Sequence, residues 1–169
     1  MTQDAPRKIV GVPRESFPGE RRAALVPAQV AVLAKAGFEV LVERAAGARA
    51  GYLDEEYAAQ GAELVDTREV VFQRADIVCQ VRAAGANRHA GAEDFELLRD
   101  GQTLIGMCDP LGHPEIMQDL AGRGVSIFVL ELLPRITRAQ KMDALSSMAN
   151  VAGYRAVVEA AYAFPYFFT

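Results

Sequence analysis

Short apolar runs alternate with segments of helical periodicity along most of the chain, and this alternation constrains the fold more than any other feature. The strand candidates are Lys8–Val12, Phe38–Val42, Glu63–Val65, Asp76–Val81, Thr103–Met107 and Val125–Leu130. The helix candidates between them are Pro27–Ala36, Asp54–Gln60, 67–74, Glu93–Leu98 and Glu115–Ala121. Such alternation predicts parallel strands joined by crossover helices. We therefore expect an α/β fold with a doubly wound, mostly parallel sheet of the Rossmann-like or flavodoxin-like type.

The last part of the chain departs from this alternation. Pro134 breaks the pattern, and one helical tract runs from about Arg138 to Phe164 without a strand after it. A tract of this length is too long for one more crossover helix, so we expect it to lead into a second domain. The aromatic tail Tyr166–Phe168 suggests an interface, because exposed apolar patches usually mark one. We divide the chain into an α/β domain, 1–134, and a connecting helix, 135–169.

Composition excludes several classes of function. The 169 residues are 51% hydrophobic and 24% charged, with a formal net charge of −4, which is typical of a globular protein and predicts no nucleic-acid binding. No run approaches the roughly 20 apolar residues of a membrane span, and the first residues lack the apolar core of a secretory signal. Cys79 and Cys108 show no metal-ligand spacing, so we expect reduced, buried thiols and a cytoplasmic protein without a metal site.

The segment Gly11–Pro27 is the first that carries candidate chemistry. Its strand ends at Pro13 and is followed by a loop that contains Arg14, Arg21 and Arg22. Cations beyond the carboxyl end of a parallel strand can hold a carboxylate or a phosphate. The alternative is a solvated loop whose charges are balanced by Glu15 and Glu20, and spacing alone favours it.

The segment Pro134–Tyr154 is the second. Thr137 and Gln140 fit a capping box at the start of the long helix. From Gln140 onward polar residues recur three or four positions apart, at Asp143, Ser146 and Asn150, and predict a polar stripe on one helix face. Such a stripe can hydrogen-bond a planar polar ligand such as a carboxamide. A capped, solvated helix face is the alternative interpretation.

Other catalytic patterns are lacking from the sequence. It contains neither Gly-x-Gly-x-x-Gly nor a phosphate-binding loop. Neither His89 nor His113 lies in an arrangement of Ser, Cys or carboxylate residues that suggests nucleophilic catalysis. We therefore predict no catalytic residue of the acid–base kind.

The two segments together resemble the alanine dehydrogenase and transhydrogenase superfamily. The opening G-V-P-R-E…E-R-R-A-A-L-V-P is similar to the superfamily as a whole. The second, P-R-I-T-R-A-Q-K-M-D-A-L-S-S-M-A-N-V-A-G-Y, is more specific and resembles the α subunit of proton-translocating NAD(P) transhydrogenases. The resemblance covers the whole chain. It implies hydride transfer from NADH to NADP⁺, of the Si-specific type, coupled to proton movement across a membrane.

The resemblance also implies which residues bind the nucleotide. Arg135, Gln140, Asp143 and Ser146 correspond to the family's residues that position the nicotinamide of NAD(H). Arg135 and Gln140 would steady the carboxamide, and Asp143 and Ser146 would complete its hydrogen bonds. Direct transfer of hydride between two rings needs no acid or base at a carbonyl.

The resemblance further implies partners. The family continues into a Rossmann domain that holds the adenosine and pyrophosphate of NAD, so residues 135–169 would lead to that domain and the isolated chain would be inactive. NADP(H) would be bound by a partner subunit, and membrane-spanning subunits would conduct protons. We expect a homo-dimer that is peripheral to the inner membrane through these partners.

Two other functions remain open. An amino-acid dehydrogenase of the alanine type needs a substrate-binding Lys after the fourth strand and an acid–base His after the fifth, where this chain has Arg82 and Asp109. Arginine cannot release a proton in the working pH range, so Arg82 cannot replace the proton-transferring lysine. Arg22 matches the superfamily's substrate-carboxylate arginine, but its usual partners are not present. The remaining alternative is a non-catalytic interaction module.

Overall fold

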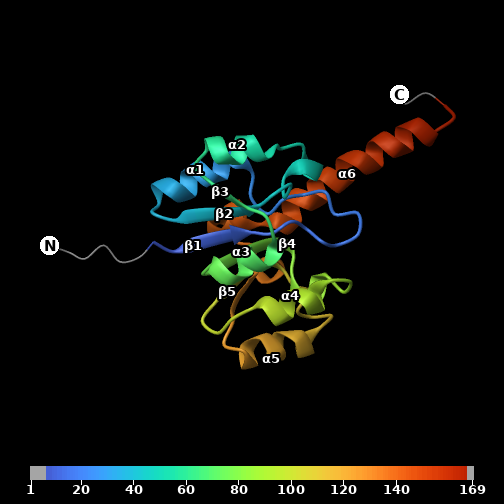
Figure 1. Ribbon diagram of the computed structural model, residues 1–169. Helices are drawn as coiled ribbons and strands as arrows, with labels where there is room; N and C mark the ends of the chain where they lie inside the picture. Colours follow the sequence, from blue (N-terminus) through green and yellow to red (C-terminus); the bar gives the residue numbers. More distant parts are fainter. Residues whose placement is uncertain (1–6, 167–169) are drawn as a thin grey trace. The chain divides into compact units, whose positions relative to one another are not determined.

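The computed structural model describes residues 7–166 and contains a six-stranded parallel sheet (Figure 1). The strands are β1 (Ile9–Val12), β2 (Glu39–Glu43), β3 (Glu63–Val65), β4 (Ile77–Arg82), β5 (Thr103–Met107) and β6 (Ser126–Val129). The α-helices are α1 (Pro27–Lys35), α2 (Asp54–Ala59), α3 (Arg68–Arg74), α4 (Gly91–Leu97), α5 (Pro114–Gly122) and α6 (Ala144–Ala163). Short 3₁₀ helices are η1 (Ala48–Ala50), η2 (Ala84–Ala86), η3 (Leu130–Leu132) and η4 (Thr137–Met142).

The sheet has the strand order β3-β2-β1-β4-β5-β6, and every pair is parallel. The order reverses between β1 and β4, where Val10 lies opposite Ile77. The carboxyl ends of strands on either side of such a reversal form the usual ligand crevice of doubly wound sheets. The predicted fold class is confirmed, and each strand candidate corresponds to an observed strand within about two residues.

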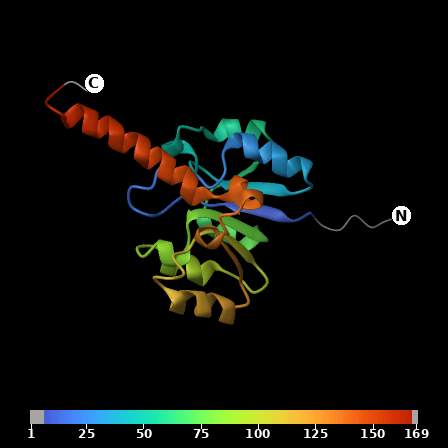
Figure 2. The ribbon, with the colours of Figure 1, turned by 180° about the vertical axis from the view of Figure 1, so that it is seen from behind.

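Helices cover both faces of the sheet, as Figures 1 and 2 show from opposite sides. Side chains alternate between the faces of β2: Val40 packs with Val30 of α1 and Tyr57 of α2, whereas Leu41 packs with Val71 of α3. Helices α1 and α2 therefore lie on one face and α3 on the other.

A third apolar cluster joins α3 to the later helices. It contains Phe72 of α3, Leu104 of β5 and Leu120 of α5, with Phe95 of α4 packed against it. Gly11 in β1 permits the close approach of α3, because a Cβ atom there would lie 2.7 Å from side-chain atoms of both Val71 and Ala75. These contacts hold the carboxyl ends of the central strands in place.

Residues 130–169 form a compact unit separate from residues 1–129. The single helical tract expected from Arg138 is wrong at its start, because η4 occupies Thr137–Met142 and α6 begins only at Ala144. Of the tail expected at an interface, Tyr166 is exposed, whereas residues 167–169 lie outside the described part. Within residues 7–166, no helix combines the length and apolar character that a bilayer crossing requires.

Candidate functional site

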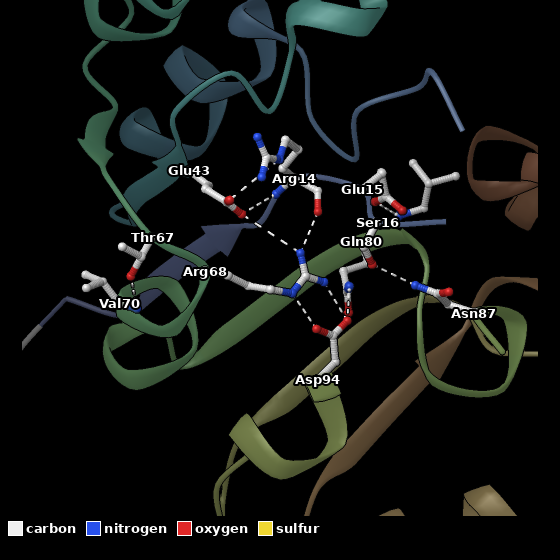
Figure 3. Close-up of polar contacts among 11 residues, drawn as sticks. Arg14, Glu15, Ser16, Glu43, Thr67, Arg68, Val70, Gln80, Asn87 and Asp94 are labelled. Carbon is white, nitrogen blue, oxygen red and sulfur yellow. Dashed lines mark hydrogen bonds and ion pairs between the residues drawn. The ribbon is translucent and has the colours of Figure 1, made fainter. Parts of the chain in front are cut away.

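Buried charges gather at the carboxyl ends of β1, β2 and β4 (Figure 3). Arg68 at the start of α3 forms an ion pair with Asp94 of α4 and donates to the backbone oxygen of Arg14 at 2.5 Å. Gln80 of β4 donates to the same Asp94 carboxylate at 2.8 Å, and Glu43 of β2 accepts from the Arg14 backbone nitrogen at 2.7 Å. The ion pair and its hydrogen bonds offset the desolvation cost of these buried charges, and loss of one partner would leave the other charge buried and unpaired. The network has a structural role, because it joins three strands to two helices.

Glu15 in the loop after β1 is a buried carboxylate bound mainly by backbone. It accepts hydrogen bonds from the backbone nitrogens of Val81 at 2.5 Å and Arg82 at 3.1 Å. Burial raises the pKa of Glu15, and these two backbone donors offset only part of that effect. Glu15 thereby ties the loop after β1 to the end of β4.

Glu20 holds two of the cations that follow the central strands. Arg22 donates to it through Nε at 2.8 Å and Nη2 at 2.6 Å, and Arg82 donates at 3.2 Å. The Arg22 hydrogen bonds lower the pKa of Glu20 to about 2. Arg82 also lies 4.2 Å above the ring of Phe17. The pairing of Arg22 with Glu20 agrees with the interpretation of Gly11–Pro27 as a charge-balanced loop. The expected solvation of that loop is wrong for Glu15 and Glu20, whose side chains are buried.

The second candidate site lies in the unit formed by residues 130–169. A pocket of about 390 Å³ is lined by all four residues predicted to position nicotinamide, together with one further serine: Arg135, Gln140, Asp143, Ser146 and Ser147. The structure therefore brings Arg135, Gln140, Asp143 and Ser146 together, although their role toward a nucleotide stays a prediction. Asn150, which the polar stripe also contained, is not among the lining residues.

Local backbone structure explains how the pocket forms. Asp143 is the N-cap of α6: its Oδ1 accepts from the backbone nitrogen of Ser146 at 2.9 Å. The expected capping box of Thr137 and Gln140 is wrong, because η4 has Ile136 at its N-cap position and no side-chain cap. Within residues 7–166 the exposed Gln140 side chain makes no hydrogen bond, so both its amide donor and its acceptor are available to a ligand.

Asp143 is the most constrained polar group in this pocket. Its Oδ2 accepts from the hydroxyl of Ser146 at 2.6 Å, and its backbone oxygen accepts from the hydroxyl of Ser147 at 3.1 Å. The Ser146 hydroxyl and backbone N–H lower the pKa of Asp143, so the carboxyl group is ionised near neutral pH. The pocket thus combines donors from Arg135 and Gln140 with fixed acceptors at the start of α6.

A larger pocket of about 470 Å³ lies between η2, α4 and α5, and no feature of the sequence predicts it. It is lined by apolar groups such as Phe95 and Ile116 and by His113, whose Nδ1 lies 3.0 Å from a Glu115 carboxylate oxygen. Among the described residues no group of three or more His, Cys, Asp or Glu side chains is arranged to hold a metal ion.

The sheet order with its reversal between β1 and β4 defines a doubly wound α/β protein. Residues 11–152 match the family model described as alanine dehydrogenase/PNT, N-terminal domain. The chain belongs to this family, as the sequence resemblance predicted.

Individual relatives agree with this assignment. The chain is 46% identical over 160 residues to the NAD(P) transhydrogenase subunit alpha of Cereibacter sphaeroides, which covers 95% of this chain and 29% of that protein. The crystal structure of transhydrogenase from Sinorhizobium meliloti has a TM-score of 0.84 and 39% identity, and the match covers 94% of this chain and 46% of that one. An L-alanine dehydrogenase structure has a TM-score of 0.78 and 25% identity, with coverage of 91% and 40%. The chain spans less than half the length of each.

Proposed function

We propose that this chain is the nicotinamide-positioning part of the NAD(H)-binding subunit of a proton-translocating transhydrogenase. The observation that carries the proposal is the pocket in which Arg135, Gln140, Asp143 and Ser146 converge. The similarity to transhydrogenase α subunits over 95% of the chain supports it.

The donors and acceptors of the pocket match a ring carboxamide. A carboxamide has an oxygen that accepts and an NH₂ group that donates. Arg135 and Gln140 offer donors for the oxygen, and the Asp143–Ser146 pair offers acceptors for the NH₂ group. These residues hold and orient the substrate, which for direct hydride transfer must present one ring face to the acceptor ring.

The chemistry itself comes from the nucleotides. A C–H bond of the reduced ring of NADH breaks, and its electron pair and hydrogen form the new C–H bond on the ring of NADP⁺. No proton has to be moved at a carbonyl, so the pocket needs no acid or base. We assign the remaining functions to other parts of the complex: a Rossmann domain for the rest of NAD(H), an NADP(H)-binding partner, and membrane-spanning subunits that conduct protons.

We further propose a homo-dimer on the cytoplasmic side of the inner membrane. The exposed apolar side chains Val151, Tyr154 and Tyr162 on α6 support an interface, since a helix surface of this kind is seldom left in water.

The second candidate function, an amino-acid dehydrogenase, is disfavoured. Arg82 is engaged by Glu20 and the Phe17 ring, and arginine cannot act as a proton-transferring group.

The proposal is tested with Gln140→Glu in the complete transhydrogenase. Glu keeps the shape of Gln140 but loses the amide donor, so we expect hydride transfer in single turnovers to slow by about 100-fold, as misplacement of a reactant can cause. Melting should be unchanged, because the Gln140 side chain has no hydrogen bond within the described residues.

Thr137→Ala is the matched control. Thr137 belongs to the same 3₁₀ helix, is exposed and does not line the pocket, so its loss should leave the hydride-transfer rate at the wild-type value. A Gln140→Glu rate within a few-fold of wild type would remove Gln140 from the site.

A further inference from the structure

Glu15 takes the place of a strand partner at the end of β4. Strand β1 is registered with β4 through only two residue pairs, near the start of β4, and the pairing of β4 with β5 is irregular before Arg82. The Glu15 carboxylate accepts hydrogen bonds from the backbone nitrogens of Val81 at 2.5 Å and Arg82 at 3.1 Å. Because backbone donors inside a fold need a partner, these two N–H groups depend on the loop after β1.

Ser16, the next residue of that loop, holds the middle of the segment that follows β4. Its hydroxyl oxygen accepts from Nδ2 of Asn87 at 2.8 Å (Figure 3). Asn87 is 1% exposed, and its Oδ1 accepts from the backbone nitrogens of His89 at 3.3 Å and Ala90 at 3.2 Å. Without Ser16, a buried amide donor would lose its partner, which is costly inside a protein.

Phe17 contacts both ends of the same segment. Its ring centroid lies 4.2 Å from the guanidinium carbon of Arg82 and 5.6 Å from the ring centroid of His89, with the two rings edge to face. Both arrangements are attractive. Three consecutive residues thus attach the beginning, middle and end of residues 81–90, and we call them the clasp: Glu15, Ser16 and Phe17.

The clasped segment, residues 81–90, contains backbone strain. Ala84 has a φ of 38°, a conformation that residues with a Cβ atom rarely adopt. The start of α4 packs directly against it, because a Cβ atom at Gly91 would lie 2.6 Å from the Ala84 backbone oxygen. Strained residues persist only where the surrounding structure holds them, so strain at Ala84 favours release of the segment once its attachments are lost.

We propose that the clasp is a two-state device: residues 81–90 open locally as one unit when any of the three attachments is weakened, while the sheet stays folded. Local opening in cooperative units is a general property of folded proteins. The device bears on the larger pocket, because Ala84, Asn87 and Arg88 belong to its lining. Opening of the clasp therefore removes one wall of the 470 Å³ pocket, and closure restores it.

Two readouts on the full-length protein test this proposal. Amide hydrogen exchange of Val81 and Arg82 reports on one end of the segment, and trypsin cleavage after the exposed Arg88, identified by mass spectrometry, reports on the other. Ser16→Ala removes the bond to Asn87 alone. It should nevertheless speed amide exchange at Val81 and Arg82 by at least about tenfold, because exchange follows the population of the open unit.

Glu15→Gln is the reciprocal variant. A Gln side chain has one acceptor oxygen where the carboxylate has two, so one N–H group at the end of β4 loses its partner. Cleavage after Arg88 should rise by at least about tenfold, although Glu15 does not contact that part of the segment. Phe17→Leu keeps an apolar side chain but removes the ring, and it should raise both readouts together.

Two control variants separate local opening from other effects. Glu93→Gln makes the same chemical change at an exposed carboxylate that has no hydrogen bond or ion pair within residues 7–166. It should leave both readouts at the wild-type values. Val30→Ala removes buried volume between α1 and β2 and should lower the melting temperature by several degrees, yet it should leave both readouts unchanged.

Three outcomes would overturn the proposal. Faster cleavage after Arg88 in Ser16→Ala, with unchanged exchange at Val81 and Arg82, would mean that the three attachments act independently. Equal increases in Val30→Ala and in the clasp variants would mean that the segment opens only when the whole protein unfolds. Unchanged readouts in all clasp variants would mean that other contacts hold the segment.

Discussion

Glu20 is a buried carboxylate whose charge depends on Arg22 and Arg82. Its pKa is lowered to about 2 in the folded state from an ordinary value of 4.5. A lowered pKa contributes stability at pH values above the unfolded-state pKa, and that contribution is lost as the pH falls toward the folded-state pKa. The stabilisation is therefore complete above about pH 5 and declines between there and pH 2.

We predict that Glu20→Gln lowers the free energy of unfolding by about 1–2 kcal/mol at pH 7, because both guanidinium groups are partly exposed and screened. The difference from wild type should shrink as the pH is lowered from 5 toward 2. Urea unfolding of the two proteins across this range measures it. A difference that stays constant with pH would show that the Glu20 charge contributes nothing to stability.

Proximity in the sequence explains which residues could be predicted to lie together. The pocket residues between Arg135 and Ser146 fall within twelve positions, so a local pattern and a family resemblance were enough to predict that they form one group. The network of Arg68 and Asp94 joins residues 26 positions apart. No local spacing marks such a pair, because its members meet only when α3 and α4 pack on the sheet.

At the scale of elements, strands and crossover helices were predictable because their apolar periodicities differ. The start of the last helix was not. Polar residues at Thr137, Gln140, Asp143 and Ser146 are spaced by three, and a 3₁₀ helix followed by a new cap gives that spacing as readily as one α-helix. In the structure, Asp143 accepts a hydrogen bond from the Ser146 backbone nitrogen and caps a new helix, so the 3₁₀ helix and α6 are separate elements.

Gly11 in β1 gives a prediction about the packing of α3. A Cβ atom there would lie 2.7 Å from Ala75 Cβ and Val71 Cγ1, both in tightly packed surroundings. Gly11→Ala should therefore lower the free energy of unfolding by about 1–3 kcal/mol, the usual cost of overpacking. Chemical denaturation with a fluorescence or circular-dichroism signal provides the measurement.

Gly122→Ala is the control for that substitution. Gly122 ends α5, has no positive φ, and would place its Cβ atom in open space. Alanine is the better helix former, so this variant should be neutral or slightly more stable. Similar destabilisation of both variants would show that the contact of Gly11 with α3 is not the cause.

At the scale of the whole molecule, the chain spans 29% of the Cereibacter sphaeroides relative and contains no Gly-x-Gly-x-x-Gly. The pocket at the start of α6, about 390 Å³, is lined by polar residues that the proposed function assigns to a ring carboxamide. Much of the affinity for a dinucleotide normally comes from the pyrophosphate, which binds at a helix N-terminus after a glycine-rich turn. The proposed function therefore assigns most of the binding free energy to the remainder of the subunit.

We predict that a polypeptide of residues 1–169 alone binds NADH with a dissociation constant of about 1 mM or weaker, which corresponds to no more than about 4 kcal/mol of binding free energy. Titration calorimetry with millimolar NADH should show little heat, whereas the complete subunit under the same conditions should bind measurably tighter. Arg135→Ala should weaken NADH binding by the complete subunit and leave NADH binding by the short polypeptide almost unchanged. Micromolar binding by the short polypeptide would mean that residues 1–169 contain a complete nucleotide site. The small pocket at the start of α6 could not account for such affinity, so the site would have to lie elsewhere.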